Sequence, residues 1–321
     1  MIKLALFTVT YCGLWYRGRA LSLREQIIKA KGLGFEGISI ETKRPVALPC
    51  DLNKKDRKEI KEVADSYGVK ICAIETMSNF ARPLIEDREN NLCMVKEAIE
   101  LAADLEVDVV KVFAAWPGTS RYDGLGTYDF GRRIFDYEGN FITDVERWRL
   151  CVEGIRDAAR WAKDYGVNIA LQNHPPVIRY GYEDALQMVK EVNVENVKLC
   201  LDVPLFSNQS DEYIHEAIEA CKDVGIILSH YGSLDFDELS SGEILMRRYI
   251  NYPAFIRELK RIGYNGFLAS EECAPVLENH KYQGVEAVDR HVKAALKYIR
   301  ELLLTGKESR VINPNTRNKL N

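Results

Sequence analysis

Short apolar runs alternate with longer amphipathic stretches along almost the whole chain. The apolar runs predict eight strands, near residues 2–8, 36–41, 69–75, 108–115, 167–172, 197–202, 225–230 and 266–271. The stretches between and after them repeat apolar positions with a period of about 3.6 residues. They predict helices near residues 22–33, 52–67, 86–105, 144–165, 182–193, 211–223, 251–262 and 284–303. Strand followed by helix, repeated in this way, predicts parallel strands joined by right-handed crossovers.

Glycines mark several of the joints between a helix and the following strand. Gly34, Gly68, Gly166 and Gly263 each stand a few residues before an apolar run, where glycine can adopt the left-handed conformation that ends a helix. Composition does not change along the chain, so the eight units predict one α/β domain, a closed (β/α)8 TIM barrel over residues 1–303. An open doubly wound sheet is the lesser alternative.

Two connections are longer than barrel loops usually are. Residues 117–143 follow the fourth strand and residues 232–250 follow the seventh, and loops of this length commonly act as lids or contact surfaces. Residues 304–321 form a polar C-terminal tail. In a TIM barrel the chemistry takes place at the carboxyl ends of the strands, so the side chains that close each strand are the first to consider.

Composition excludes several classes of protein. The chain has 321 residues, of which 46% are hydrophobic and 29% charged, and its net charge of -4 comes without a lysine- or arginine-rich run. We therefore expect no nucleic-acid partner. No apolar stretch reaches the length of a membrane span and the N-terminus lacks the features of a signal peptide, so a cytoplasmic protein is expected. The eight cysteines are scattered without a Cys-x-x-Cys pair, which predicts reduced thiols.

Four strand ends in the second half of the chain carry possible metal ligands. They are Gln172, Asp202, His230 and Glu271, and each closes an apolar run. Any one of them alone could be a structural residue, because a strand-end aspartate often caps a turn. Together at one rim they offer three oxygen donors and one imidazole, a set that suits manganese or magnesium.

These positions resemble the pattern of the xylose-isomerase-like superfamily of sugar isomerases and epimerases. That pattern places a Glu after strand five, an Asp after strand six, a His after strand seven, and a Glu at the end of strand eight in Gly-Tyr-x-Gly-x-x-x-x-Glu. Here the last motif runs from Gly263 to Glu271. The resemblance covers about residues 1–303 and implies one divalent metal ion, Mn²⁺ first, with Mg²⁺, Co²⁺ and Zn²⁺ as alternatives.

The chain departs from that pattern at two positions. Gln172 stands where the family has Glu, and Leu205 stands where ketose epimerases commonly have His. The resemblance implies two carboxylate bases on opposite faces of the substrate, and an amide cannot remove a proton at neutral pH. Gln172 can still bind a metal through its carbonyl oxygen. Chemistry with a single base is therefore favoured.

Four further stretches resemble the large barrel subunit of bacterial C-glycoside deglycosidases. They are residues 11–16 (YCGLWY), 41–45 (ETKRP), 113–118 (FAAWPG) and 172–176 (QNHPP). This resemblance implies metal-dependent cleavage of the carbon–carbon bond between a 3-oxo-glucosyl group and an aromatic, flavonoid-type aglycone. The reaction would proceed by enolisation and β-elimination. It also implies a hetero-oligomer with a small β-rich second subunit.

The residues suit such chemistry. His174 and Glu271 are the candidate catalytic bases, because imidazole and carboxylate groups both transfer protons near neutral pH. Side chains at the other strand ends are candidates for substrate binding, with packing of the barrel rim as the plainer explanation: Tyr11, Trp15, Glu41, Lys43, Glu75, Trp116 and Phe206.

Other functions remain open at this level. The alternative enzyme is a sugar or sugar-phosphate isomerase or epimerase on the same barrel. A non-catalytic sugar-binding barrel is the alternative from another class, and the loss of the strand-five Glu keeps it in consideration. The acidic charge and the few histidines disfavour an apurinic endonuclease with several zinc ions.

Overall fold

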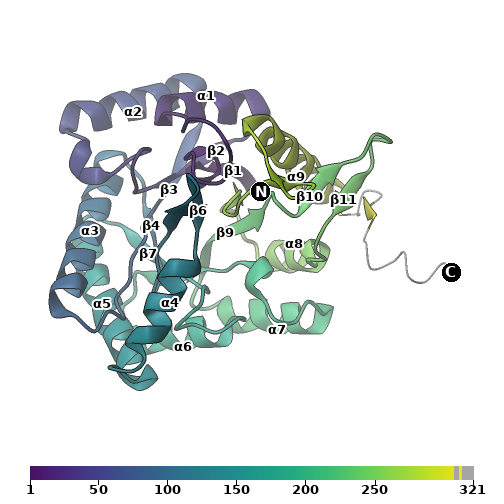
Figure 1. Cartoon of the computed structure of the whole chain (residues 1–321). Helices are drawn as coiled ribbons and strands as arrows, with labels where there is room; N and C mark the ends of the chain where they lie inside the picture. The colour runs from purple at the N-terminus through teal and green to yellow at the C-terminus, as the bar shows by residue number, and fades with distance from the viewer. Residues whose placement is uncertain (307–310, 313–321) are drawn as a thin grey trace.

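Eight parallel strands close into a barrel in this computed structural model, which describes residues 1–306 and 311–312 (Figure 1). Around the barrel the strands follow the order β1-β12-β9-β8-β7-β4-β3-β2. Their bounds are β1 Lys3–Phe7, β2 Gly37–Glu41, β3 Lys70–Glu75, β4 Val109–Val112, β7 Asn168–Gln172, β8 Val197–Cys200, β9 Ile226–Gly232 and β12 Phe267–Glu271. The predicted TIM barrel is thus confirmed.

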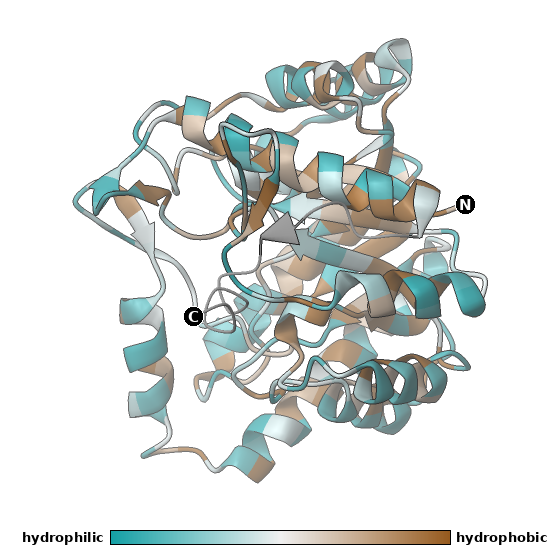
Figure 2. Ribbon diagram, turned by 90° about the vertical axis from the view of Figure 1, so that its right-hand side faces the viewer, coloured by the Kyte–Doolittle hydropathy of each residue, from teal (hydrophilic) through white to brown (hydrophobic). Residues whose placement is uncertain are grey.

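Eight helices cover the outside of the barrel. They are α1 Leu23–Leu33, α2 Lys54–Tyr67, α3 Ile85–Asp104, α5 Asp144–Asp164, α6 Glu183–Val192, α7 Asp211–Cys221, α8 Tyr252–Arg261 and α9 Val285–Thr305. Capping explains where several helices begin. At α1 the side chains of Ser22 and Glu25 each accept a hydrogen bond from the backbone N–H of the other residue. Gly34 ends α1 with a φ of 91°, a conformation that costs glycine little. In Figure 2 the barrel strands are largely brown and the helices carry teal faces.

The interior of the barrel is packed with side chains. Ala73, Val109, Ala170, Cys200 and Leu228 form a small inner cluster. A much larger apolar layer surrounds the barrel strands and contacts the helices. Gly37 opens β2 where a Cβ atom would lie 2.5 Å from the Phe267 ring, so this side of the barrel has room only for glycine.

The two long connections hold secondary structure and are not simple loops. The first contains β5 Ser120–Tyr122, β6 Leu125–Thr127 and α4 Asp129–Glu138, and the second contains β10 Phe236–Glu238 and β11 Ile244–Met246. These elements are too short for apolar periodicity to reveal them. In Figure 1, β6 and α4 lie in front of the barrel, and β10 and β11 project to one side.

Shorter elements complete the described chain. They are η1 Thr8–Tyr11, η2 Pro49–Asp51, η3 Val203–Leu205, β13 Leu277–Glu278, β14 Lys281–Tyr282 and β15 Val311–Ile312. β15 pairs with β11 in parallel. Most of the tail expected over 304–321 lies outside the described residues. All eight cysteines are free thiols. Within the described chain no helix combines the length and the apolar character needed to cross a bilayer.

Candidate active site

Three of the four strand-end residues contact one another at the carboxyl end of the barrel. β7, β8 and β9 are neighbours, so Gln172, Asp202 and His230 come from adjacent strands. The Gln172 Nε2 donates to Asp202 Oδ2 at 2.5 Å, and the His230 backbone N–H donates to Asp202 Oδ1 at 2.7 Å. His230 Nδ1 lies 3.0 Å from Asp202 Oδ2. All three side chains are buried, so these polar groups are held in place by one another and not by solvent.

A second carboxylate holds the other side of the His230 ring. The Nε2 of His230 lies 3.1 Å from Glu75 Oε1, and Lys111 Nζ lies 3.2 Å from Glu75 Oε2. Burial would raise the pKa of Glu75, but the charges of His230 and Lys111 outweigh it and lower the pKa. For His230 burial acts in the opposite sense, and Glu75 and Asp202 overcome it and raise the pKa. A carboxylate on the far ring nitrogen is the usual partner of a metal-binding histidine.

Glu271 ends β12, the next strand around the barrel. Burial raises the pKa of its carboxyl group to about 7, the His230 charge opposes this rise, and Asp202 and Glu75 add to it. A bound divalent cation would lower that pKa again, because its charge favours the carboxylate. Glu271 is therefore a group whose charge depends strongly on what occupies the site.

The donor set fits a divalent metal ion. The Oε1 atom of Gln172 is buried and has no hydrogen-bond partner, which leaves its carbonyl oxygen free to be a ligand. Asp202 supplies a carboxylate, His230 is oriented by Glu75, and Glu271 on the neighbouring strand β12 would supply a second carboxylate. The thiol of Cys200 also lies here, within 4.8 Å of ligand atoms of Asp202 and His230. Burial raises the pKa of Cys200 to about 12, so the thiol is neutral unless a bound metal ion lowers that pKa.

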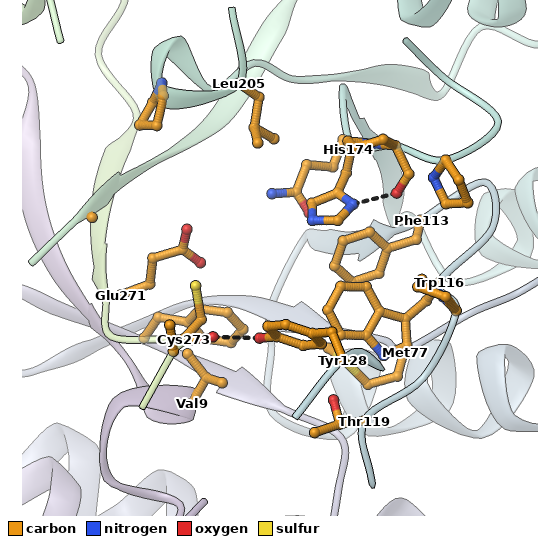
Figure 3. A pocket seen from close by; sticks show the side chains of 18 of the residues that line it. Val9, Met77, Phe113, Trp116, Thr119, Tyr128, His174, Leu205, Glu271 and Cys273 are labelled. Atoms are coloured by element: carbon orange, nitrogen blue, oxygen red, sulfur yellow. Dashed lines mark hydrogen bonds between the residues drawn. The ribbon is translucent and has the colours of Figure 1, made fainter. Parts of the chain in front are cut away.

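A cavity of about 520 Å³ opens above these residues. Figure 3 shows Glu271 on one side of it and Phe113, Trp116 and Tyr128 on the other. The volume lies within the range of about 300–1,000 Å³ typical of small-molecule sites. Its lining is mostly apolar, with Gln172, His174, Glu41, Lys43 and Lys111 among the polar members.

His174 follows strand β7 and faces the cavity opposite Glu271 (Figure 3). Its Nδ1 lies 2.6 Å from the Pro175 carbonyl oxygen, which only an N–H can satisfy, so Nδ1 carries the proton. Burial lowers the pKa of His174 to about 4. The ring is therefore neutral at pH 7, with an unprotonated Nε2. Ring contacts with Phe113 at 4.9 Å and Trp116 at 5.2 Å hold its orientation.

The residues expected to bind substrate divide into two groups. Trp15, Glu41, Lys43 and Trp116 line the cavity. Glu41 keeps one buried carboxylate oxygen without a partner, while the other lies 2.7 Å from Lys43 Nζ.

The other three predicted residues are not in the cavity lining. Tyr11 is buried and donates to Asp289, and Phe206 packs against Tyr213. Glu75 is fully buried and bonds His230. Strand-end position brings a residue near the rim, but the direction of the side chain decides whether it reaches the cavity.

Sequence reasoning missed several residues of this site. Lys111 was visible as a single charge inside the apolar run of β4, and such a charge is rarely buried without a partner. Arg132 and Tyr128 reach the cavity from the 117–143 connection. The strand pattern does not predict which residues of such an insertion reach the cavity, because their positions depend on how the whole chain folds.

The model of the xylose isomerase-like TIM barrel family matches residues 27–302. The chain belongs to this family. No curated protein sequence matches it. Among solved structures, D-psicose 3-epimerase from Clostridium cellulolyticum H10 is similar, with a TM-score of 0.69 and 19% identity over 94% of this chain and 99% of the other.

Two further solved structures share the fold. One is 3-keto-D-glucoside 4-epimerase from E. coli, with a TM-score of 0.65 and 16% identity over 94% of this chain and 99% of that one. The other is the IolI protein with a bound zinc atom, with a TM-score of 0.63 and 19% identity over the same shares. At such identities the likeness is one of fold.

Proposed function

We propose that the protein is a metal-dependent sugar isomerase or epimerase that moves a proton on the carbon next to a carbonyl group. One observation carries the proposal. Glu271 and His174, two side chains able to exchange protons, lie on opposite sides of one cavity, next to the buried group of Gln172, Asp202 and His230. The TIM-barrel relatives described as epimerases of keto sugars support the same class of substrate.

The arrangement gives each side chain a role. In one direction the Glu271 carboxylate takes the proton from one face of the sugar carbon, and His174, protonated at Nε2, gives a proton to the other face. In the reverse direction the free Nε2 of neutral His174 takes the proton, and the protonated Glu271 carboxyl group gives one back. The free oxygen of Glu41 and the Lys43 ammonium hold sugar hydroxyls, and the aromatic wall excludes water. Gln172, Asp202, His230 and Glu271 would hold a divalent ion, for which we propose Mn²⁺, that polarises the carbonyl as a Lewis acid.

Incubation with single keto sugars tests this proposal. The purified protein, supplied with Mn²⁺, should convert one of D-psicose, D-fructose, D-tagatose or a 3-keto-glucoside into an epimer or isomer. Asp202→Asn should abolish conversion. Binding of these sugars without conversion, under all metal conditions, would instead identify a sugar-binding barrel and contradict the proposal.

Carbon–carbon bond cleavage of a 3-oxo-C-glycoside is the second candidate function. Two observations favour it, the amide at Gln172 and the wall of Phe113, Trp116 and Tyr128, which suits a flat aromatic leaving group. Elimination needs one base to remove the C2 proton while the C1–aryl bond breaks and the aryl carbon takes up a proton. Release of free aglycone from a 3-oxo-C-glucoside would establish this activity in place of epimerisation.

We also propose that a small β-rich subunit binds beside the cavity. The 117–143 insertion and the start of α5 present large exposed apolar side chains, a feature of contact surfaces: Tyr122, Phe130, Tyr137, Phe141 and Val145. Co-expression with a small β-rich candidate subunit should give one complex on size exclusion. A Phe130→Ser, Phe141→Ser variant that still forms that complex would refute this surface.

A further inference from the structure

One cationic side chain at the cavity has no carboxylate partner among the residues that the structure describes. Four lysine and arginine side chains line the cavity. Lys43 is paired with Glu41, Lys111 with Glu75, and Arg248 with Asp235 at 3.1 Å. Within residues 1–306, Arg132 forms no ion pair within 4.0 Å. Its charge is therefore free to bind a ligand.

Arg132 is exposed, and its side chain lies over an aromatic ring of the cavity wall. Its guanidinium carbon lies 5.8 Å from the centre of the Tyr128 ring. That ring packs against Trp15 at 5.1 Å and Trp116 at 5.4 Å. The Tyr128 hydroxyl donates to the Cys273 carbonyl oxygen at 2.5 Å, which ties the insertion to the loop after β12 (Figure 3).

Close packing holds the helix that carries Arg132 in this place. Gly131 precedes it on α4, and a Cβ atom there would lie 2.5 Å from the Pro117 carbonyl oxygen. The helix thus approaches the backbone directly after Trp116. The packing of α4 therefore places the backbone of Arg132 beside the aromatic wall.

A neighbouring carboxylate competes only weakly for Arg132. Asp136 follows it by four residues on α4, also lines the cavity and is exposed. An exposed pair of this spacing stabilises by only about 0.5 kcal/mol, and it is less favourable when the cation comes first. An anionic ligand that also contacts the aromatic wall would displace it.

We propose that Arg132 binds an anionic group, a carboxylate or an ionised phenol, on an aromatic part of the substrate that lies against Trp116 and Tyr128. The sugar end of the same substrate then reaches Glu271 across the cavity. This assignment rests on the proposed function only in taking the cavity as the substrate site.

Binding of small aromatic probes tests the proposal without any turnover. The probes are 4-hydroxybenzoate, its neutral counterpart 4-hydroxybenzamide, and inorganic phosphate, each titrated into the full chain. Binding is followed by calorimetry and by tryptophan fluorescence, since two of the four tryptophans, Trp15 and Trp116, line the cavity. Arg132→Gln is compared with Arg133→Gln, which removes the same charge from the next residue of α4, a residue that does not line the cavity.

The expected result is that 4-hydroxybenzoate binds more tightly than the amide, and that Arg132→Gln weakens its binding about tenfold, or about 1.4 kcal/mol. Arg133→Gln should change the affinity for 4-hydroxybenzoate less than about twofold. The affinity for 4-hydroxybenzamide should be the same in both variants. Equal losses in the two variants, or no preference for the carboxylate, would overturn the proposal. If inorganic phosphate at equal concentration displaces 4-hydroxybenzoate from the wild type but not from Arg132→Gln, the claim that the anionic group lies on an aromatic ring would be overturned. If the protein converts none of the proposed sugars but still shows the Arg132 effect, only the proposed function is contradicted.

Discussion

Gln172→Glu restores a carboxylate at the position where the family has one, and its effect can be worked out from the structure. In the wild type the amide N–H donates to Asp202 Oδ2 at 2.5 Å. The substitution replaces that donor by an acceptor, so two carboxylate oxygens face each other in a buried place. Without a metal ion the variant should be less stable than the wild type, and with one it should not.

Protonation limits the size of the loss. Two unit charges 2.5 Å apart repel by about 7 kcal/mol at an effective dielectric constant of about 20. Adding a proton to a glutamate of ordinary pKa, about 4.3, costs only about 4 kcal/mol at pH 7. The introduced carboxyl group therefore takes up the proton, donates it to Asp202, and destabilises the fold by at most about 4 kcal/mol.

The loss has a defined dependence on pH. The folded-state pKa of the carboxyl group that Gln172→Glu introduces is raised, so the destabilisation is absent below the unfolded pKa of about 4.3 and grows as pH rises above it. At pH 5.5 it should be about 1.6 kcal/mol. At pH 7 the melting temperature should fall by roughly 8–15 °C, at roughly 2–4 °C per kcal/mol.

Thermal unfolding after chelation, repeated with saturating Mn²⁺, measures these effects. Gln187→Glu is the control, because it adds the same charge on the exposed face of α6 and should cost a few tenths of a kcal/mol at most. Mn²⁺ should raise the melting temperature of Gln172→Glu more than that of the wild type. If the variant is as stable as the wild type at pH 7 without metal, or if Mn²⁺ does not rescue it, Gln172 does not have the role described here.

The same site supports three more predictions. Lys111→Met removes one of the two cations beside the buried Glu75 carboxylate, the other being His230, and should lower the free energy of unfolding by up to about 3–5 kcal/mol in urea at pH 7; a change below about 1 kcal/mol would contradict the buried pair. Chelation should lower the melting temperature of the wild type, and Mn²⁺ at about a hundred times its Kd should restore about 2.7 kcal/mol, whereas Asp202→Asn should show no such response. Ile155→Ala, in the core outside the barrel, should cost about 2–5 kcal/mol yet keep the Mn²⁺ response, and loss of that response would show that the metal effect is not local.

Much of the fold could be predicted because its elements are long and regular. The run from Ile71 to Ile74 and the helical period of residues 86–105 each bury one set of side chains, and burial is what the pattern reports. The short β5, β6 and α4 bury too few side chains to leave such a pattern, so the 117–143 segment was expected only as a loop.

The site could be predicted as far as strand order determines it. Gln172, Asp202 and His230 meet because β7, β8 and β9 are adjacent in the barrel. The partner of His230 could not be foreseen, because Glu75 comes from β3, across the barrel, and was expected to bind substrate. The placement of Tyr11 and Phe206 away from the cavity also depends on side-chain direction, which strand ends alone do not specify.

The proposed function depends above all on Glu271, which must move a proton on a carbon next to a sugar carbonyl. Incubation of the Mn²⁺-loaded protein with a keto sugar substrate in D2O, followed by NMR, observes that proton transfer itself. Deuterium should enter at that one carbon, and Glu271→Gln should abolish the exchange. Product formed without solvent deuterium at that carbon, or full exchange in Glu271→Gln, would contradict the proposed role of Glu271.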